Sequence, residues 1–251
     1  MTGEQIENLF GLMLEYTIPT LKIFCFTLLY SIPLGMVVAL LKMCRFKPVS
    51  WLTNIYILIM RGTPLLLQLI VAQYSVPYIL KSDACPAFLH ALLDGVDIRS
   101  ESYTFNMMLF AFVLNYAAYF AEIFRGGIES IPKGQYEAAG ALGLNRMQTF
   151  FRIILPQVIR RVLPASSNEI ITLVKDTSLA SAIPYMEIMY IAKKQVPTYA
   201  SLVPLFMAGL FYFAFAMVLT LLLSLIEKSL DPMWRRNVKT LRKGIFRRGN
   251  A

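Results

Sequence analysis

The feature that most constrains this 251-residue chain is a set of long stretches without charged residues. Residues 23–41 carry no charge between Lys22 and Lys42, and residues 196–226 carry none at all. About 20 apolar residues in a helix cross the roughly 30 Å hydrocarbon core of a bilayer. These stretches therefore predict an all-α integral membrane protein.

Five membrane spans are predicted, at residues 20–42, 51–78, 104–125, 154–174 and 202–227. The fourth is the weakest, because it is interrupted by Pro156, Arg160, Arg161, Pro164 and Glu169. Only 16% of the residues are charged, against about 25% in soluble domains. We interpret residues 1–251 as a single transmembrane domain with its core at residues 18–230.

The orientation of the spans follows from the side on which lysine and arginine gather. The turn after the first span holds Lys42, Arg45 and Lys47 and no acidic residue, and the tail at residues 231–251 is strongly basic. The segment between the second and third spans has an acidic balance instead. The N-terminus is therefore predicted outside and the C-terminus in the cytoplasm. The net charge of +9 reflects this orientation and attraction to anionic lipid, and no nucleic-acid partner is predicted.

Residues 1–17 are predicted to form a short amphipathic helix at the outer surface. Glu4 and Glu7 stand where a signal peptide carries positive charge, so no signal peptide is predicted. One histidine and three isolated cysteines offer neither a metal site nor a disulfide framework. Residues 126–134 resemble a phosphate loop only superficially, because Pro132 interrupts them and no strand precedes them. The chain is therefore predicted to be non-catalytic and to hold no cofactor.

The segment between the third and fourth spans carries the most informative pattern. In residues 137–142, Glu137 is followed mostly by small residues, and Gly143 comes next. Glycine commonly ends a helix, so a short helix is predicted on the cytoplasmic side. Its small side chains would let the backbone approach a groove on another protein closely. Composition alone leaves an ordinary loop helix equally open.

Glu137-Ala138-Ala139, then Gly143, then Ile153-x-Leu155-Pro156 resemble the EAA motif of permease subunits of binding-protein-dependent ABC importers. Further stretches are similar to the polar amino-acid permeases, the histidine, glutamine and arginine group. They are residues 61–68, 121–128, 133–135, 155–157 and 175–179. The resemblance covers roughly residues 17–230, and residues 87–103 match nothing in it.

This resemblance implies the ABC type I importer permease fold in the bacterial cytoplasmic (inner) membrane. It implies that the loop helix docks on an ATPase subunit through Gly134, Glu137, Ala138, Ala139, Gly140 and Gly143. The implied partners are ABC ATPase subunits, which would hold ATP and Mg, an extracytoplasmic amino-acid-binding protein, and a second permease subunit, identical or paralogous. ATP binding would then draw the loop helices together and switch the spans between inward-facing and outward-facing states.

Gly62, Thr63 and Pro64 predict a break inside the second span. Glycine can end a helix, threonine suits the N-cap position, and proline suits the first helical position. A broken span presents a helix N-terminus, which attracts an anion such as the α-carboxylate of an amino acid. We therefore place the α-carboxylate near Thr63, with Gln68 on the same pathway. A simple proline kink is the alternative.

Polar residues inside the later spans complete the predicted substrate pathway, because ionisable groups within a membrane are functional candidates. The candidates are Asn115, Tyr119 and Glu122 on one face of the third span, and Asn168 and Glu169 in the fourth. Glu122 could hold a cationic side chain or an α-amino group, or could instead pair with Arg125 three residues later.

The substrate class stays open at this stage. Glu122 and Glu169 favour a basic amino acid such as arginine, lysine or histidine, while glutamine, cystine and acidic amino acids remain alternatives. A five-span channel or secondary transporter that works without an ATPase is the alternative function. It would need a relay of intramembrane charges, and Arg61, Glu122 and Glu169 do not follow one another along one helix.

Overall fold

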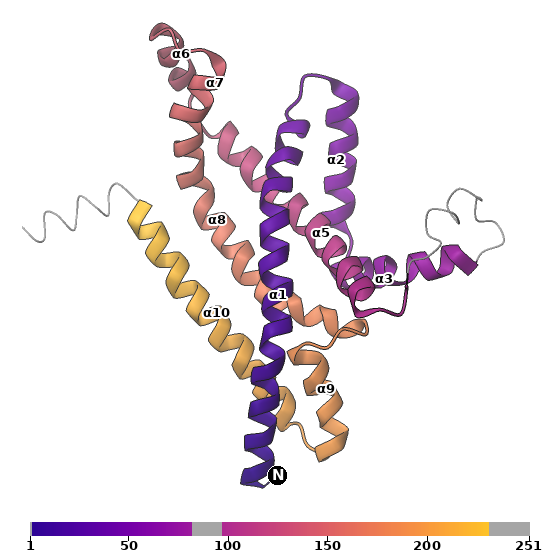
Figure 1. Cartoon of the computed structure of the whole chain (residues 1–251). Coiled ribbons are helices and arrows are strands. Elements are labelled where there is room, and N and C mark those ends of the chain that lie inside the picture. Colours follow the sequence, from indigo (N-terminus) through magenta and orange to yellow (C-terminus); the bar gives the residue numbers. More distant parts are fainter. Residues whose placement is uncertain (1, 82–96, 231–251) are drawn as a thin grey trace, which may run out of the picture. The chain divides into compact units, whose positions relative to one another are not determined.

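The computed structural model describes residues 2–81 and 97–230, and within them every regular element is helical (Figure 1). The α-helices are α1 (Gly3–Lys42), α2 (Lys47–Gly62), α3 (Leu65–Lys81), α5 (Glu101–Glu129), α6 (Lys133–Ala141), α7 (Arg146–Thr149), α8 (Leu155–Asp176), α9 (Ile188–Tyr199) and α10 (Val203–Leu230). A π-helical turn, η1 (Phe150–Ile154), precedes α8, and a 3-10 turn, η2 (Thr177–Ala182), follows it. The predicted basic tail 231–251 and most of the segment 87–103 lie outside the described residues.

The chain divides into two compact units. The first joins the residues up to Glu122 with Thr172–Ala214, and the second joins Ile123–Ile171 with the chain from Phe215. The first unit therefore contains α1, α2, α3 and α9 entire, and the second contains α6 and α7. Helices α5, α8 and α10 each begin in one unit and end in the other.

Three of the described helices, α1, α5 and α10, are long and apolar enough to cross a membrane, and the pair α2 and α3 would count as a fourth span. The predicted fourth span coincides with α8, but this helix is less apolar and is not among the described helices that could cross a membrane by length and composition. Its Val158 and Val162 are buried while Arg160 and Arg161 are exposed. A helix with such a charged face needs water or another protein surface on that side.

The N-terminal segment differs from the prediction. Residues 3–42 form one continuous helix of 40 residues, so the expected amphipathic segment is not a separate element. Pro19 lies inside the helix without ending it. Nearby hydroxyls donate to carbonyls four residues earlier: Thr17 Oγ1 to Met13 O at 2.9 Å and Thr20 Oγ1 to Tyr16 O at 3.0 Å. Neither acceptor is the Glu15 carbonyl, which is the one that Pro19 leaves without its backbone N–H donor.

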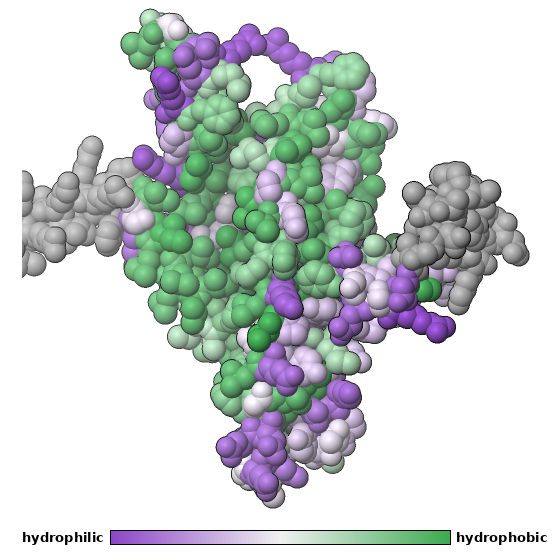
Figure 2. Space-filling model, viewed as in Figure 1, coloured by the Kyte–Doolittle hydropathy of each residue, from purple (hydrophilic) through white to green (hydrophobic). Residues whose placement is uncertain are grey.

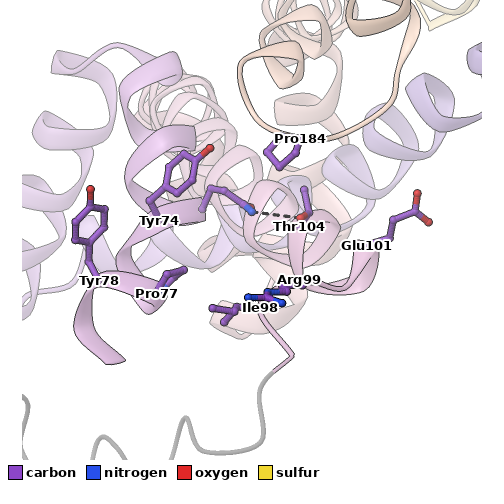
Figure 3. A pocket seen from close by; sticks show the side chains of 9 residues that line it. Tyr74, Pro77, Tyr78, Ile98, Arg99, Glu101, Thr104 and Pro184 are labelled. Carbon is purple, nitrogen blue, oxygen red and sulfur yellow. Dashed lines mark hydrogen bonds between the residues drawn. The ribbon is translucent and has the colours of Figure 1, made fainter. Parts of the chain in front are cut away.

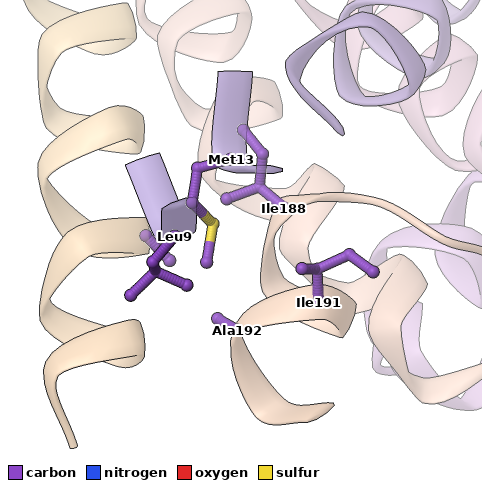
Figure 4. Packing of buried hydrophobic residues seen from close by; sticks show 6 residues of the cluster. Leu9, Met13, Ile188, Ile191 and Ala192 are labelled. Atoms are coloured by element: carbon purple, nitrogen blue, oxygen red, sulfur yellow. The ribbon is translucent and has the colours of Figure 1, made fainter. Parts of the chain in front are cut away.

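A buried apolar cluster in the first unit explains why the start of α1 stays helical (Figure 4). It packs α1 against α9 and the beginning of α10, and its buried members are Leu9, Met13, Ile188, Ile191, Ala192 and Ala208. Most helical stability in proteins comes from such packing rather than from local propensity. The cluster also fixes the short helix α9 in place.

Apolar side chains cover the outside of several helices as well as the interior. On α10, the exposed residues include Phe206, Leu210, Phe213, Leu221 and Leu225, and Figure 2 shows this helix as hydrophobic surface. Apolar patches of this extent mark surfaces that meet lipid or another protein. The exposed faces therefore support the predicted membrane location.

Candidate functional site

The second predicted span is broken where the sequence predicts it. Helix α2 ends at Gly62, α3 begins at Leu65, and their axes differ by 106°. This bend is far larger than a proline kink within a continuing helix. The interruption is therefore confirmed, and the alternative of a simple kink is excluded.

The structure corrects the role predicted for Thr63. Its backbone N–H donates to Ile59 O at 3.1 Å, and its Oγ1 donates to the same carbonyl at 2.8 Å. Thr63 therefore completes the C-terminal end of α2 rather than capping α3. The first turn of α3 starts at the carbonyl of Pro64, which accepts the Gln68 N–H at 3.2 Å.

Two side-chain amides hold the break together. Gln68 Nε2 donates to Thr63 Oγ1 at 2.8 Å and to Met60 O at 3.0 Å. Asn115 Nδ2, from α5, donates to Met60 O at 2.9 Å and to Gln68 Oε1 at 3.0 Å. Asn115 is only 4% exposed, whereas Thr63 is exposed. The Met60 carbonyl at the break thus gains donors, and the buried Asn115 amide and the Gln68 amide fix the exposed turn by hydrogen bonds.

This arrangement suits an anionic group. The backbone N–H groups at the start of a helix and its positive dipole end attract negative charge. Arg61 lies beside the break with its side chain 43% exposed, and its guanidinium stacks 5.2 Å from the ring centroid of Tyr119. Five predicted pathway residues thus meet at the break, namely Gly62, Thr63, Pro64, Gln68 and Asn115, and Tyr119 joins them through Arg61.

Glu122 has a partner that the sequence does not suggest. Lys42 Nζ, at the end of α1, lies 2.5 Å from Glu122 Oε1, and Arg61 Nη1 lies 4.0 Å from Glu122 Oε2. The sequence spacing offers Arg125 as a partner of Glu122, but Arg125 Nη1 lies 2.6 Å from Glu129 Oε2. A carboxylate flanked by two cations offers little net negative charge to a basic substrate. The structure thus gives Glu122 a bracing contact between α1, α2 and α5.

Asn168 and Glu169 belong to the second unit, on α8. Asn168 is exposed and Glu169 is partly exposed. They follow Ser166 and Ser167, two buried serines whose hydroxyls have no partner among the described residues. The substrate roles of Asn168 and Glu169 stay predictions.

The predicted loop helix is present as α6, and it starts four residues earlier than the small-residue pattern suggests. Its C-terminal end is a Schellman motif: Leu144 N donates to Ala139 O at 3.1 Å, and Gly143 N donates to Gly140 O at 2.9 Å. Gly143 has φ +73°, a conformation that glycine adopts without strain. The end of the helix at Gly143 is therefore confirmed.

The α6 segment is exposed almost throughout. Ala139 is fully buried, so it packs α6 onto its own unit and is not available to a partner. The other predicted coupling residues are exposed: Gly134, Glu137, Ala138, Gly140 and Gly143. Leu142 is 76% exposed beside them. A Cβ placed on Gly134 or Gly140 would meet nothing within 4 Å, so packing within this chain does not require glycine at either position.

Comparisons with known proteins identify the family of the chain. Residues 31–232 match the family described as binding-protein-dependent transport system inner membrane component. The octopine transport system permease protein OccM of Rhizobium radiobacter is 39% identical, over 88% of this chain and 87% of the relative. The arginine transport system permease protein ArtQ of Bacillus subtilis is 35% identical, over 87% of this chain and 92% of the relative.

Solved structures show the same fold. A crystal structure of an amino acid ABC transporter with histidines covers 91% of this chain and 99% of its own, with a TM-score of 0.76 and 29% identity. The MetNI methionine ABC transporter, at 14% identity and a TM-score of 0.68, supports the fold alone over 92% of this chain and 100% of its own. The permease family, the importer fold and the inner-membrane location predicted from the sequence are confirmed. The chain belongs to the family of binding-protein-dependent transport system inner membrane components.

Proposed function

We propose that the chain moves a polar amino acid across the cytoplasmic membrane as one permease subunit of an ATP-driven importer, coupled to a separate ATPase through α6. The observation that supports coupling most directly is the exposure of α6 together with Gly134 and Gly140. Because a side chain at either glycine would contact nothing within 4 Å, an intolerance of larger residues there would arise from a partner. The ATPase subunits would supply ATP and Mg, and this chain would hydrolyse no ATP itself.

The substrate proposal rests on the helix break and on the relatives. The break offers helix N–H groups and the Arg61 guanidinium to an α-carboxylate. Relatives are named for octopine, arginine and L-cystine. We propose a polar amino acid, with the basic class as the first to test, delivered by an extracytoplasmic amino-acid-binding protein to a pair of permease subunits. Glu169 stays a candidate for a cationic group of the substrate on the evidence of the sequence alone.

One experiment tests the coupling. The chain is co-expressed with its ATPase and receptor, purified, and assayed in proteoliposomes for uptake of radiolabelled L-arginine, L-glutamine and L-cystine. We expect ATP-dependent uptake by the wild type, and loss of the co-purified ATPase in Gly140→Leu. Gly11→Leu is the matched control, because Gly11 lies on α1 and a Cβ there also meets nothing within 4 Å. Uptake by the chain without any ATPase would instead establish the alternative, a channel or secondary transporter.

A further inference from the structure

A cavity with a mainly apolar lining lies in the first unit, apart from the helix break. It has a volume of about 630 Å³ and is bordered by the second half of α3, the start of α5 and the loop before α9 (Figure 3). Small-ligand sites in proteins have volumes of about 300–1,000 Å³. Its walls include the apolar surfaces of Tyr74, Pro77, Ile98 and Pro184, and they include no residue of the helix break.

The most buried polar group in this wall is the Gln73 side chain, which is 4% exposed. Its Nε2 donates to Thr104 Oγ1 at 3.2 Å, the dashed line in Figure 3. Its Oε1 has no partner within the described part of the chain. A buried acceptor without a donor is unfavourable, so a ligand that donates would be stabilised here once the Gln73 side chain turns its oxygen toward the cavity.

Charges of both signs border the same cavity. Arg99 and Glu101 line it and are both exposed. Arg99 is held by a turn in which Asp97 Oδ1 accepts the Arg99 N–H at 3.0 Å and Asp97 O accepts Ser100 Oγ at 2.8 Å. One cation, one carboxylate and one unused amide oxygen suit a zwitterion better than a simple anion or cation.

We propose that this cavity binds a free amino acid before it reaches the helix break. Arg99 would hold the α-carboxylate, with the hydroxyl of Thr104 as a second donor, and guanidinium–carboxylate pairs are strong because they can be bidentate. Gln73 Oε1 and Glu101 would accept from the α-ammonium. Tyr74 and Pro77 would contact the aliphatic part of the side chain. This inference rests on the proposed function and adds a second station, on the side predicted to face outward.

Receptor-free binding tests the cavity directly. The permease–ATPase complex is placed in lipid nanodiscs, and equilibrium binding of radiolabelled L-arginine, L-glutamine and L-cystine is measured. We expect Arg99→Gln to weaken the binding of the imported amino acid about tenfold or more and Arg99→Lys to restore part of it. Gln73→Leu, which removes the unused oxygen, should weaken binding as well. Lys194→Gln is the control, because Lys194 is an exposed cation on α9 outside the cavity.

The outcomes separate this inference from the proposed function. If the wild type imports an amino acid and both Arg99→Gln and Gln73→Leu bind it as the wild type does, the cavity proposal alone fails. It also fails if Arg99→Gln weakens receptor binding while receptor-free amino-acid binding is unchanged, since the cavity would then be a receptor contact. If the wild-type complex with its receptor imports none of the three, the proposed function fails and the cavity proposal falls with it.

Discussion

Glu122 lies between two cations from other helices, with Lys42 at 2.5 Å and Arg61 at 4.0 Å. The side chains of Lys42 and Glu122 are 19% and 17% exposed, so removal of the carboxylate leaves a partly buried positive charge unpaired. We expect Glu122→Gln to lower the free energy of unfolding by about 1.5–3 kcal/mol, the usual scale for charged hydrogen bonds. The KM for amino-acid uptake should stay unchanged. Denaturation in detergent and uptake kinetics check the two parts.

Glu129→Gln is the matched control for this prediction. It breaks the pair with Arg125 four residues earlier, in which the Glu129 side chain is 51% exposed. Exposed pairs with this spacing contribute only about 0.3–0.5 kcal/mol. A raised KM for L-arginine in Glu122→Gln, with unfolding unchanged, would instead place Glu122 in a substrate site.

Glu187 is a fully buried carboxylate in the loop before α9. It accepts the Met189 N–H at 2.8 Å, the Tyr190 N–H at 2.6 Å and the Tyr212 hydroxyl at 2.6 Å. Burial raises the pKa of the Glu187 carboxyl above its ordinary value of 4.5, against the lowering effect of these hydrogen bonds. The folded state therefore binds this proton more tightly than the unfolded state does.

The sign of the resulting pH dependence follows from linkage. The stability contributed by protonated Glu187 is complete below the ordinary pKa of 4.5 and is lost as the pH rises through the raised pKa. We expect the stability of the wild type relative to Glu187→Gln to fall across that window, because glutamine does not titrate. Melting temperatures of both proteins, measured from about pH 4 to pH 8, provide the comparison. Parallel curves would contradict the assignment.

At the scale of elements, the turn between α2 and α3 is the exposed part of the proposed substrate site. A Cβ on Gly62 meets nothing within 4 Å, and Thr63→Val removes the hydroxyl that accepts from Gln68. We expect the double variant Gly62→Ala, Thr63→Val to raise the KM for uptake about tenfold, the effect of losing about 1.4 kcal/mol of binding. Competition by L-argininamide, which lacks the α-carboxylate, should be weak in the wild type. Unchanged transport and ATPase stimulation in the variant would remove the turn from the pathway.

Gly140→Leu tests contact between α6 and a partner, whereas a variant at Gly143 tests the conformation of the helix end. Gly143 has φ +73°, so an alanine there strains the backbone by about 1–2 kcal/mol and disturbs the Schellman motif itself. We expect Gly143→Ala to reduce ATPase stimulation by substrate, and Gly143→Asn to reduce it less, because asparagine tolerates this conformation. Both variants should still be inserted in the membrane at wild-type levels. Equal loss in the two variants would show that the side chain, and not the backbone conformation, is responsible.

The sequence predicts those elements whose causes are local. The break at residues 62–64 and the helix end at Gly143 both depend on backbone preferences that act within a few residues. The partners of Glu122 and Glu187 are different, since Lys42 is 80 residues away and Tyr212 is 25 residues away along the chain. No spacing rule connects such residues, because helix packing alone brings them together. Packing of Leu9 and Met13 likewise extends α1 through the segment predicted to be separate.

For the whole molecule, the distribution of basic and acidic residues predicts which side of the membrane each connection between helices faces. The basic residues after the first span and in the tail predict that the connections next to α6 face the cytoplasm. The acidic balance before α5 predicts that the Arg99 cavity faces outward. If this orientation holds, α6 faces the compartment of the proposed ATPase subunits, and the cavity faces the compartment from which the amino acid arrives.

Native cysteines give a direct test of this orientation. Cys44, exposed after α1, is predicted to face the cytoplasm, and Cys85, in the segment outside the described residues, is predicted to face outward. In intact spheroplasts, a membrane-impermeant maleimide should label a chain that retains only Cys85. A chain that retains only Cys44 should be labelled only after the membrane is permeabilised. A chain without cysteines is the control. The reverse pattern would place α6 outside the cell, where no ATPase could bind it, and would overturn the coupling proposal together with the outward location of the cavity.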